Sequence, residues 1–219
     1  MEAVRLLLAD DHEFVRKGLR SLIEEQPGWE VAAEAVDGRD AIEKAREVRP
    51  DIAVMDISMP SLNGLEATRQ ITKDGSHTKV LILTMHDSDP LVREVLNAGA
   101  RGYVLKSDAS RDLVAAVGAL CQNKTFFTSK VAQMVVDGFL NKEPESYERV
   151  PSERTRLTPR QREIVQLLAE GKSSKEVAVA LSISVKTAET HRANIMRRLS
   201  CHSVSELVRY AIRNQIVEA

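Results

Sequence analysis

Five residues in the first half of the chain could together carry out phosphoryl transfer, and four short apolar runs end on them. They are Asp10, Asp11, Asp56, Thr84 and Lys106. Crowded carboxylates repel one another unless a hard cation neutralises them, and Mg2+ with its octahedral oxygen shell suits such a set. With the metal bound, a carboxylate can attack a phosphoryl group while the cation and the lysine stabilise charge on its oxygens. The set therefore predicts an aspartyl phosphate.

Each side chain of this set has an expected role. Asp10, Asp11 and Asp56 would supply carboxylate oxygens to Mg2+, together with the backbone carbonyl of Ser58. Asp56 is the expected nucleophile, and Thr84 would donate its hydroxyl to the phosphoryl oxygens after transfer. A lone aspartate more often caps a helix or turns the chain, so these roles depend on the members occurring together.

The elements that must position these residues follow from hydrophobic periodicity. Strands are expected over residues 4–9, 32–36, 52–56, 80–84 and 102–106. Each is followed by a segment with apolar side chains at helical spacing. This alternation predicts an α/β doubly wound, five-stranded parallel sheet, in which ligands bind at the carboxyl ends of the strands. The candidate residues should therefore converge in one pocket.

Composition separates the chain into two parts. The chain has 219 residues, 43% of them hydrophobic, and a net charge of −1. From Ser152 onward there are 12 lysines and arginines against 7 aspartates and glutamates, a balance of +5 that leaves −6 on the rest. This asymmetry indicates two domains with different partners, the basic one compatible with nucleic acid. No apolar stretch reaches the length of a membrane span, so we expect a cytoplasmic protein.

Asp10, Asp11, Asp56, Thr84, Tyr103 and Lys106, in this order and at these spacings, resemble the receiver domain of two-component response regulators. The resemblance covers about residues 1–122 and implies a flavodoxin-like fold. It also implies that a histidine kinase phosphorylates Asp56 and that Tyr103 acts with Thr84 as a switch. Ser107 stands where many receivers carry proline.

A polar stretch divides the chain. Residues 129–141 have apolar side chains at helical spacing, whereas residues 142–156 contain two prolines and no periodicity, as a linker would. The expected organisation is a receiver domain over residues 1–122, a linker helix and linker over 123–156, and a second domain over 157–219.

The sequence of the second domain predicts a small all-α, four-helix unit. Thr158 is expected to cap its first helix and to form a capping box with Gln161. A short helix after Ser173 and a turn at residues 182–184 precede a longer helix over residues 185–199, which is helix-turn-helix geometry. The residues of that longer helix expected to face inward are Val185, Ala188, Ile195 and Leu199.

The opposite face of that helix could bind DNA. Its basic side chains suit phosphates, whereas Glu189, Thr190 and Asn194 can address base edges. The candidate interface comprises Lys175, Lys186, Thr187, Glu189, Thr190, Ala193, Asn194 and Arg197. On spacing alone, a helical bundle with a solvated charged face is equally compatible.

The segments 157–163, 175–178 and 185–191 resemble the LuxR-type DNA-binding domain. A receiver followed by this domain is the layout of the NarL/FixJ subfamily of response regulators, and the two resemblances cover nearly the whole chain. They imply a transcription regulator rather than an enzyme, with a sensor histidine kinase and double-stranded DNA as partners.

Two alternative functions fit parts of the chain. One is an aspartate-based phosphohydrolase, but such an enzyme needs a second acid near the nucleophile, and Ser58 stands two residues after Asp56. The other is an interaction module that does not bind DNA, which a band shift with genomic fragments would distinguish.

We also expect a homodimer on activation. One recognition helix spans only a few base pairs, so useful specificity needs two half-sites and a two-fold dimer. The last helix offers a seam formed by Val204, Leu207, Val208 and Ala211. Phosphorylation would shift the chain from a state in which the acidic receiver covers the basic domain to a DNA-competent dimer.

Overall fold

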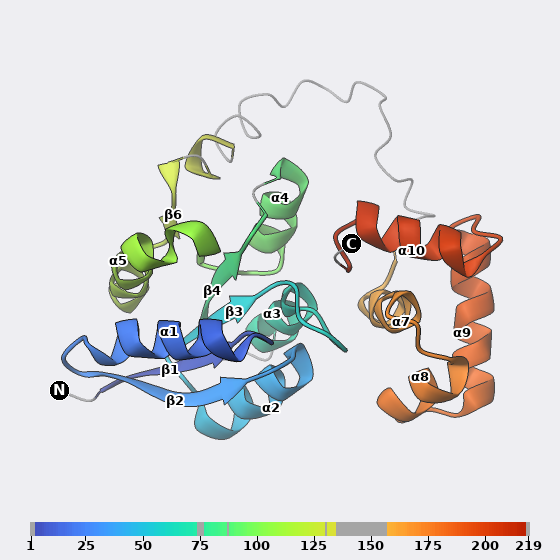
Figure 1. Ribbon diagram of the computed structural model, residues 1–219, viewed down its shortest axis with the longest axis horizontal. Coiled ribbons are helices and arrows are strands. Elements are labelled where there is room, and N and C mark those ends of the chain that lie inside the picture. Colours follow the sequence, from blue (N-terminus) through green and yellow to red (C-terminus); the bar gives the residue numbers. More distant parts are fainter. Residues whose placement is uncertain (1–2, 74–76, 87, 130, 135–156, 218–219) are drawn as a thin grey trace. The chain divides into compact units, whose positions relative to one another are not determined.

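A computed structural model describes residues 3–73, 77–86, 88–129, 131–134 and 157–217 (Figure 1). The chain divides into two compact units, Met1–Lys142 and Glu143–Ala219. The helix expected over 129–141 is described only at its start, where 129 and 131–134 are helical, and the linker expected over 142–156 lies outside the described residues. No helix among the described residues is long and apolar enough to cross a membrane.

The first unit is built on a parallel sheet with the strand order β2-β1-β3-β4-β5-β6. The strands are β1 (Val4–Ala9), β2 (Trp29–Ala35), β3 (Ile52–Asp56), β4 (Lys79–Thr84), β5 (Gly102–Leu105) and β6 (Phe126–Phe127). The five expected strands are confirmed. The sixth was not expected, because a two-residue strand is too short to show periodicity. Lys106 does not end β5 but begins a single 3-10 turn, Lys106–Asp108.

Among the described residues, helices cover both faces of this sheet. One face carries α1 (Glu13–Glu24) and α5 (Ala109–Cys121), and the other carries α2 (Gly38–Val48), α3 (Gly64–Lys73) and α4 (Asp89–Asn97). Successive strand residues point to opposite faces, so β3, which is covered on both faces, is apolar up to its last residue, whereas β2 at the edge of the sheet carries Glu30 and Glu34. On β3, for example, Ala53 and Met55 join one core, whereas Ile52 and Val54 join the other.

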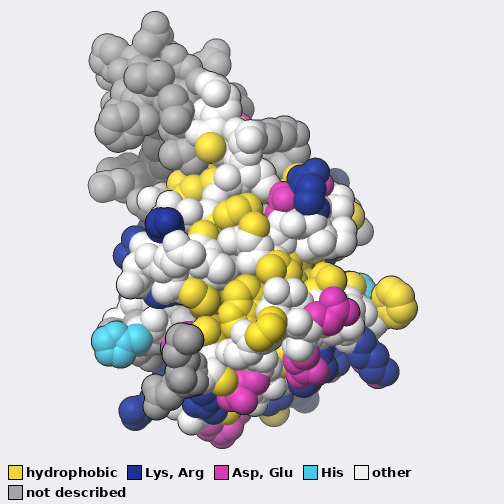
Figure 2. Space-filling model, turned by 90° about the vertical axis from the view of Figure 1, so that its left-hand side faces the viewer, with side chains coloured by type: hydrophobic (Ala, Val, Ile, Leu, Met, Phe, Trp, Pro, Cys, Tyr) yellow, Lys and Arg dark blue, Asp and Glu magenta, His cyan; other side chains and the backbone are white. Residues whose placement is uncertain are grey.

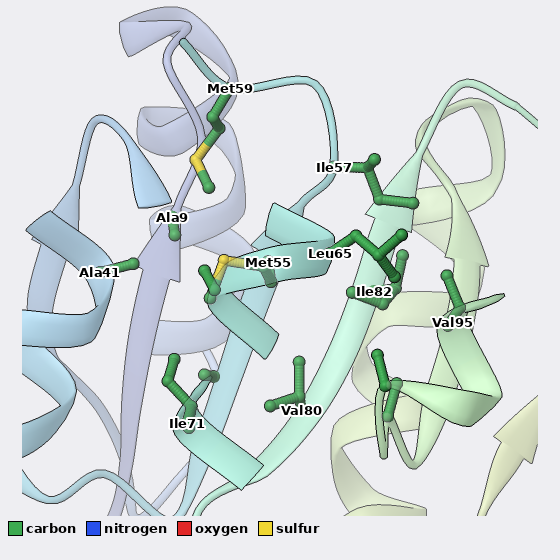
Figure 3. Packing of buried hydrophobic residues seen from close by; sticks show 14 of the residues in the cluster. Ala9, Ala41, Met55, Ile57, Met59, Leu65, Ile71, Val80, Ile82 and Val95 are labelled. Carbon is green, nitrogen blue, oxygen red and sulfur yellow. The ribbon is translucent and has the colours of Figure 1, made fainter. Parts of the chain in front are cut away.

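Close packing holds the core under α2, α3 and α4 together. Figure 3 shows Met55 of β3 and Val80 and Ile82 of β4 near Leu65 and Ile71 of α3.

Apolar side chains also gather on the outside of this unit: Figure 2 shows a band of them across the face at the left of Figure 1, with acidic and basic side chains around it. We call this surface the apolar band.

The second unit contains α7 (Pro159–Ala169), α8 (Ser174–Ala180), α9 (Val185–Arg198) and α10 (Val204–Arg213). The capping box of Thr158 with Gln161 is confirmed, and Ser173 forms a second one with Glu176. These caps satisfy backbone N–H groups that have no partner within the helix. The core of this unit includes Ala188 and Ile195 of α9.

Val185 was expected to face inward, and this expectation is wrong. Its side chain is 39% exposed, and it does not belong to the core cluster of the second unit. Val185 is the first residue of α9, where the helix has only begun to turn toward the core. Leu199, immediately after the helix, is half-buried and packs against that core.

Candidate functional site

Asp56 ends β3, the strand between β1 and β4, and every residue of β3 is buried. The chain turns sharply after it, and Gly64 closes the turn by donating a backbone hydrogen bond to the carbonyl of Ile57 at 2.9 Å. A Cβ atom at Gly64 would lie only 1.8 Å from the carbonyl oxygen of Asp56. The start of α3 therefore packs directly on the Asp56 backbone and fixes its position.

Lys106 joins two of the carboxylates at the end of the sheet. Its Nζ lies 2.8 Å from Asp10 Oδ2 and 2.9 Å from Asp56 Oδ2. Asp10 and Asp56 are only 1% and 2% exposed. The three residues come from the ends of three different strands, so the sheet topology brings them together as expected.

The charges in this cluster influence one another. Burial is the largest influence on the pKa of Asp56 and raises it, although the Lys106 ammonium opposes the rise. Burial also tends to lower the pKa of Lys106, but the carboxylates of Asp10 and Asp56 outweigh it, so this pKa is raised. The lysine therefore stays charged, in a position where it can stabilise further negative charge on Asp56.

The donor atoms at this edge fit a hard cation. One ligand atom each of Asp10, Asp11 and His12 lie within 4.8 Å of one another. The Oδ2 atoms of Asp10 and Asp56 are buried. Each lies next to the Lys106 ammonium, and neither accepts a further hydrogen bond from the described part of the chain. Buried carboxylate oxygens with this capacity are ligands that a divalent cation prefers.

His12 is a neighbour of the site that the sequence did not single out. Its Nδ1 lies 2.8 Å from Asp11 Oδ1 and its backbone N–H donates to Asp10 Oδ1 at 2.9 Å. It thereby holds both carboxylates at the start of α1. Ser58, whose carbonyl was expected to join the metal ligands, is half-buried.

The side chains of Thr84 and Tyr103 both form hydrogen bonds with the backbone of His86. Both are fully buried. The Thr84 hydroxyl accepts a hydrogen bond from the backbone N–H of His86 at 3.3 Å, and the Tyr103 hydroxyl donates to the carbonyl of the same residue. The segment between β4 and α4 is therefore attached to both side chains, and a shift of Thr84 would be felt at Tyr103.

All eight residues of the candidate DNA interface are exposed. Seven lie on α9, and Lys175 lies on α8. Two hydroxyls in this set are already engaged: that of Thr187 lies 2.8 Å from Ser184 Oγ, and that of Thr190 donates to the Lys186 carbonyl at 2.8 Å. The latter can still accept a hydrogen bond from a base.

The expected dimer seam on α10 needs a correction. Leu207 and Ala211 are 0% exposed and belong to the core of the second unit, so they cannot present a surface. Val204 is exposed and Val208 is half-buried. Ile212, which was not in the predicted seam, is 36% exposed.

Comparisons with known proteins match both units. The response regulator receiver domain matches residues 6–118, and the family of bacterial regulatory proteins of the luxR type matches residues 155–211. The oxygen regulatory protein NreC of Staphylococcus epidermidis is 37% identical over 217 residues, which are 98% of this chain and 100% of NreC.

Solved structures agree with this result. A LuxR-family two-component response regulator from an Aurantimonas species is 39% identical, with a TM-score of 0.59, over 64% of this chain and 99% of that chain. The response regulator RcsB in a complex with DNA is 25% identical, with a TM-score of 0.58, over 95% of this chain and 98% of that one.

Proposed function

Because this chain belongs to the two-component response regulators that join a receiver domain to a LuxR-type DNA-binding domain, we propose that phosphorylation of Asp56 by a sensor histidine kinase controls its binding to DNA. The observation that carries the proposal is the contact of Lys106 with both Asp10 and Asp56 within 2.9 Å. It places a buried carboxylate beside a fixed cation at the edge of the sheet where ligands bind.

In the proposed reaction, a carboxylate oxygen of Asp56 attacks the phosphorus atom of the donor's phosphohistidine. The new O–P bond forms as the P–N bond breaks, and the electron pair of that bond stays on the imidazole nitrogen. Lys106 stabilises the charge that gathers on the phosphoryl oxygens, and the packing of Gly64 holds the nucleophile in place. Mg2+, held by Asp10, Asp11, Asp56 and the Ser58 carbonyl, would neutralise charge on the transferred group.

The switch would act through the segment before α4. A phosphoryl group on Asp56 offers new acceptors to the Thr84 hydroxyl, and movement of Thr84 toward them would displace His86, whose backbone N–H donates to that hydroxyl. Because the Tyr103 hydroxyl donates to the His86 carbonyl, moving His86 changes the surroundings of Tyr103. The surface of the receiver then differs between the two states, as a population shift requires.

DNA would bind through the exposed face of α9, with Lys186, Arg197 and Lys175 on phosphates. Glu189 and Asn194 are the candidates for base edges. The domain boundaries that we propose are 1–122, 123–156 and 157–219.

Homodimerisation on activation needs surfaces that remain exposed in one chain. On α10 these are Val204 and Ile212, together with the half-buried Val208, and on the receiver the apolar band of Figure 2 is a second candidate. Because its proposed target is the chromosome of a bacterium, we place the protein in the cytoplasm.

The chemistry can be tested on the whole chain with acetyl phosphate, Mg2+ and intact-protein mass spectrometry. We expect the mass of one phosphoryl group on the wild type and none on Asp56→Asn. Asp51→Asn is the matched control, because Asp51 is an exposed carboxylate just before the opposite end of β3. Equal labelling of wild type and Asp56→Asn would refute the assignment. Rapid turnover of acetyl phosphate with no labelled protein would favour the phosphohydrolase instead.

A further inference from the structure

The first residue of α9 presents an apolar side chain to solvent. Val185 is 39% exposed and lies outside the core cluster of its unit. Ser184 caps the helix directly before it, accepting a hydrogen bond from the Thr187 N–H at 3.0 Å. The cap fixes the backbone of Val185 at the helix start, while packing within the unit does not account for a valine side chain there.

Val185 stands where a recognition helix touches bases. In helix-turn-helix proteins the N-terminal residues of the second helix contact base edges in the major groove. Val185, Glu189 and Ala193 follow one another at intervals of four residues, so they lie along one side of α9. All three are exposed. This side offers two apolar side chains with a carboxylate between them.

The chemistry of the major groove suggests what such a side can read. Thymine alone among the four bases presents a methyl group there, and apolar side chains recognise it by contact. A glutamate accepts a hydrogen bond from the amino group of cytosine. An exposed valine therefore matches thymine, whereas a phosphate or a base amino group would leave its methyl groups without a favourable contact.

We propose that Val185 is a base-reading residue whose γ-methyl groups contact the 5-methyl group of a thymine, beside the base that Glu189 addresses. The inference rests on the proposed DNA-binding function and adds to it the identity of one base in the half-site. Removing a single buried methyl contact should weaken binding about three- to fivefold.

The test uses the full chain with Mg2+ and acetyl phosphate. The wild type first selects duplexes from a randomised library, and each thymine of the enriched half-site is then replaced by deoxyuridine, which lacks only the methyl group. Binding is compared for the wild type, Val185→Ala and Val179→Ala. Val179 is the matched control, because it is also a valine with an exposed side chain in the second unit, but it lies on α8 and belongs neither to the candidate DNA interface nor to the dimer surface.

We expect one thymine whose replacement weakens the wild type and Val179→Ala about three- to fivefold and leaves Val185→Ala unchanged. Circular dichroism melts check that Val185→Ala folds, and Val185→Ser serves as a second variant with the same expected result. Specific binding without any methyl-sensitive thymine, or with a sensitivity that persists in Val185→Ala, would overturn the inference and leave the proposed function standing. If no sequence is enriched at all, the proposed function itself fails, and the inference with it.

Discussion

Replacing Gly64 by alanine should damage the phosphorylation site through the backbone alone. The added Cβ would lie 1.8 Å from the Asp56 carbonyl oxygen, whereas ordinary contacts begin at 3.4 Å, so the two segments must separate by about 1.6 Å. Overpacking of this kind costs about 1–3 kcal/mol or more, and we expect a loss of about 2 kcal/mol. A displacement near 1 Å at a reacting group can slow a reaction about 100-fold.

Urea unfolding of the full chain measures the stability change. Trp29 is the only tryptophan of the chain and lies on β2, so its fluorescence reports unfolding of the receiver alone. A loss of 2 kcal/mol should lower the urea midpoint by about 1 M. The rate of labelling by acetyl phosphate, followed by mass, measures the effect on Asp56.

Gly18→Ala is the matched control for this prediction. Gly18 lies within α1, and nothing comes within 4 Å of a Cβ atom built on it. Alanine should therefore stabilise the receiver by about 0.5–1 kcal/mol, because glycine inside a helix carries an entropic cost. If Gly64→Ala unfolds at the wild-type urea concentration and is labelled at the wild-type rate, the packing argument for Asp56 is wrong.

Three further predictions concern other parts of the chain. Burial raises the pKa of Glu34, but Arg20 and Arg16 outweigh it and the net pKa is lowered; Glu34→Gln should therefore cost about 1 kcal/mol at pH 7. In urea titrations that difference should vanish as pH falls through the folded-state pKa, and a pH-independent difference would exclude the ion pairs as its source. Thr158→Ala removes a capping box and should cost about 1 kcal/mol, seen as a lower melting temperature of the second unit by circular dichroism. Lys186→Ala should weaken specific and random duplexes alike and reduce the slope of log affinity against log salt by about 1, and a loss confined to the specific duplex would contradict a phosphate contact.

The sequence predicted best those features that depend on local chemistry. The apolar run of β3 and the carboxylate at its end are visible without coordinates, because a strand buried on both faces allows no polar alternation. The capping box of Thr158 follows from residue types three positions apart. The convergence of Asp10, Asp56 and Lys106 followed from the rule that parallel strands present their carboxyl ends at one edge.

The features that were missed depend on contacts or on position within an element. His12 gave no signal in the sequence, because its link to Asp11 appears only when the turn after β1 is built. Leu207 and Val204 lie on one apolar stripe of α10, yet one is core and the other surface, and periodicity cannot separate the centre of a stripe from its edge. Val185 precedes Ala188 by three residues, which is the spacing of neighbours on one buried face of a helix. It lies on the first turn of α9, however, and periodicity does not show that this turn leaves the core.

The central claim is that phosphorylation of Asp56 controls DNA binding, and one binding measurement tests it directly. The affinity of the full chain for the duplex that it selects is measured with Mg2+, with and without acetyl phosphate, for the wild type and Asp56→Asn. We predict that acetyl phosphate tightens binding by the wild type and leaves Asp56→Asn unchanged. Equal affinity of the wild type before and after labelling, with mass spectrometry confirming the phosphoryl group, would contradict the claim.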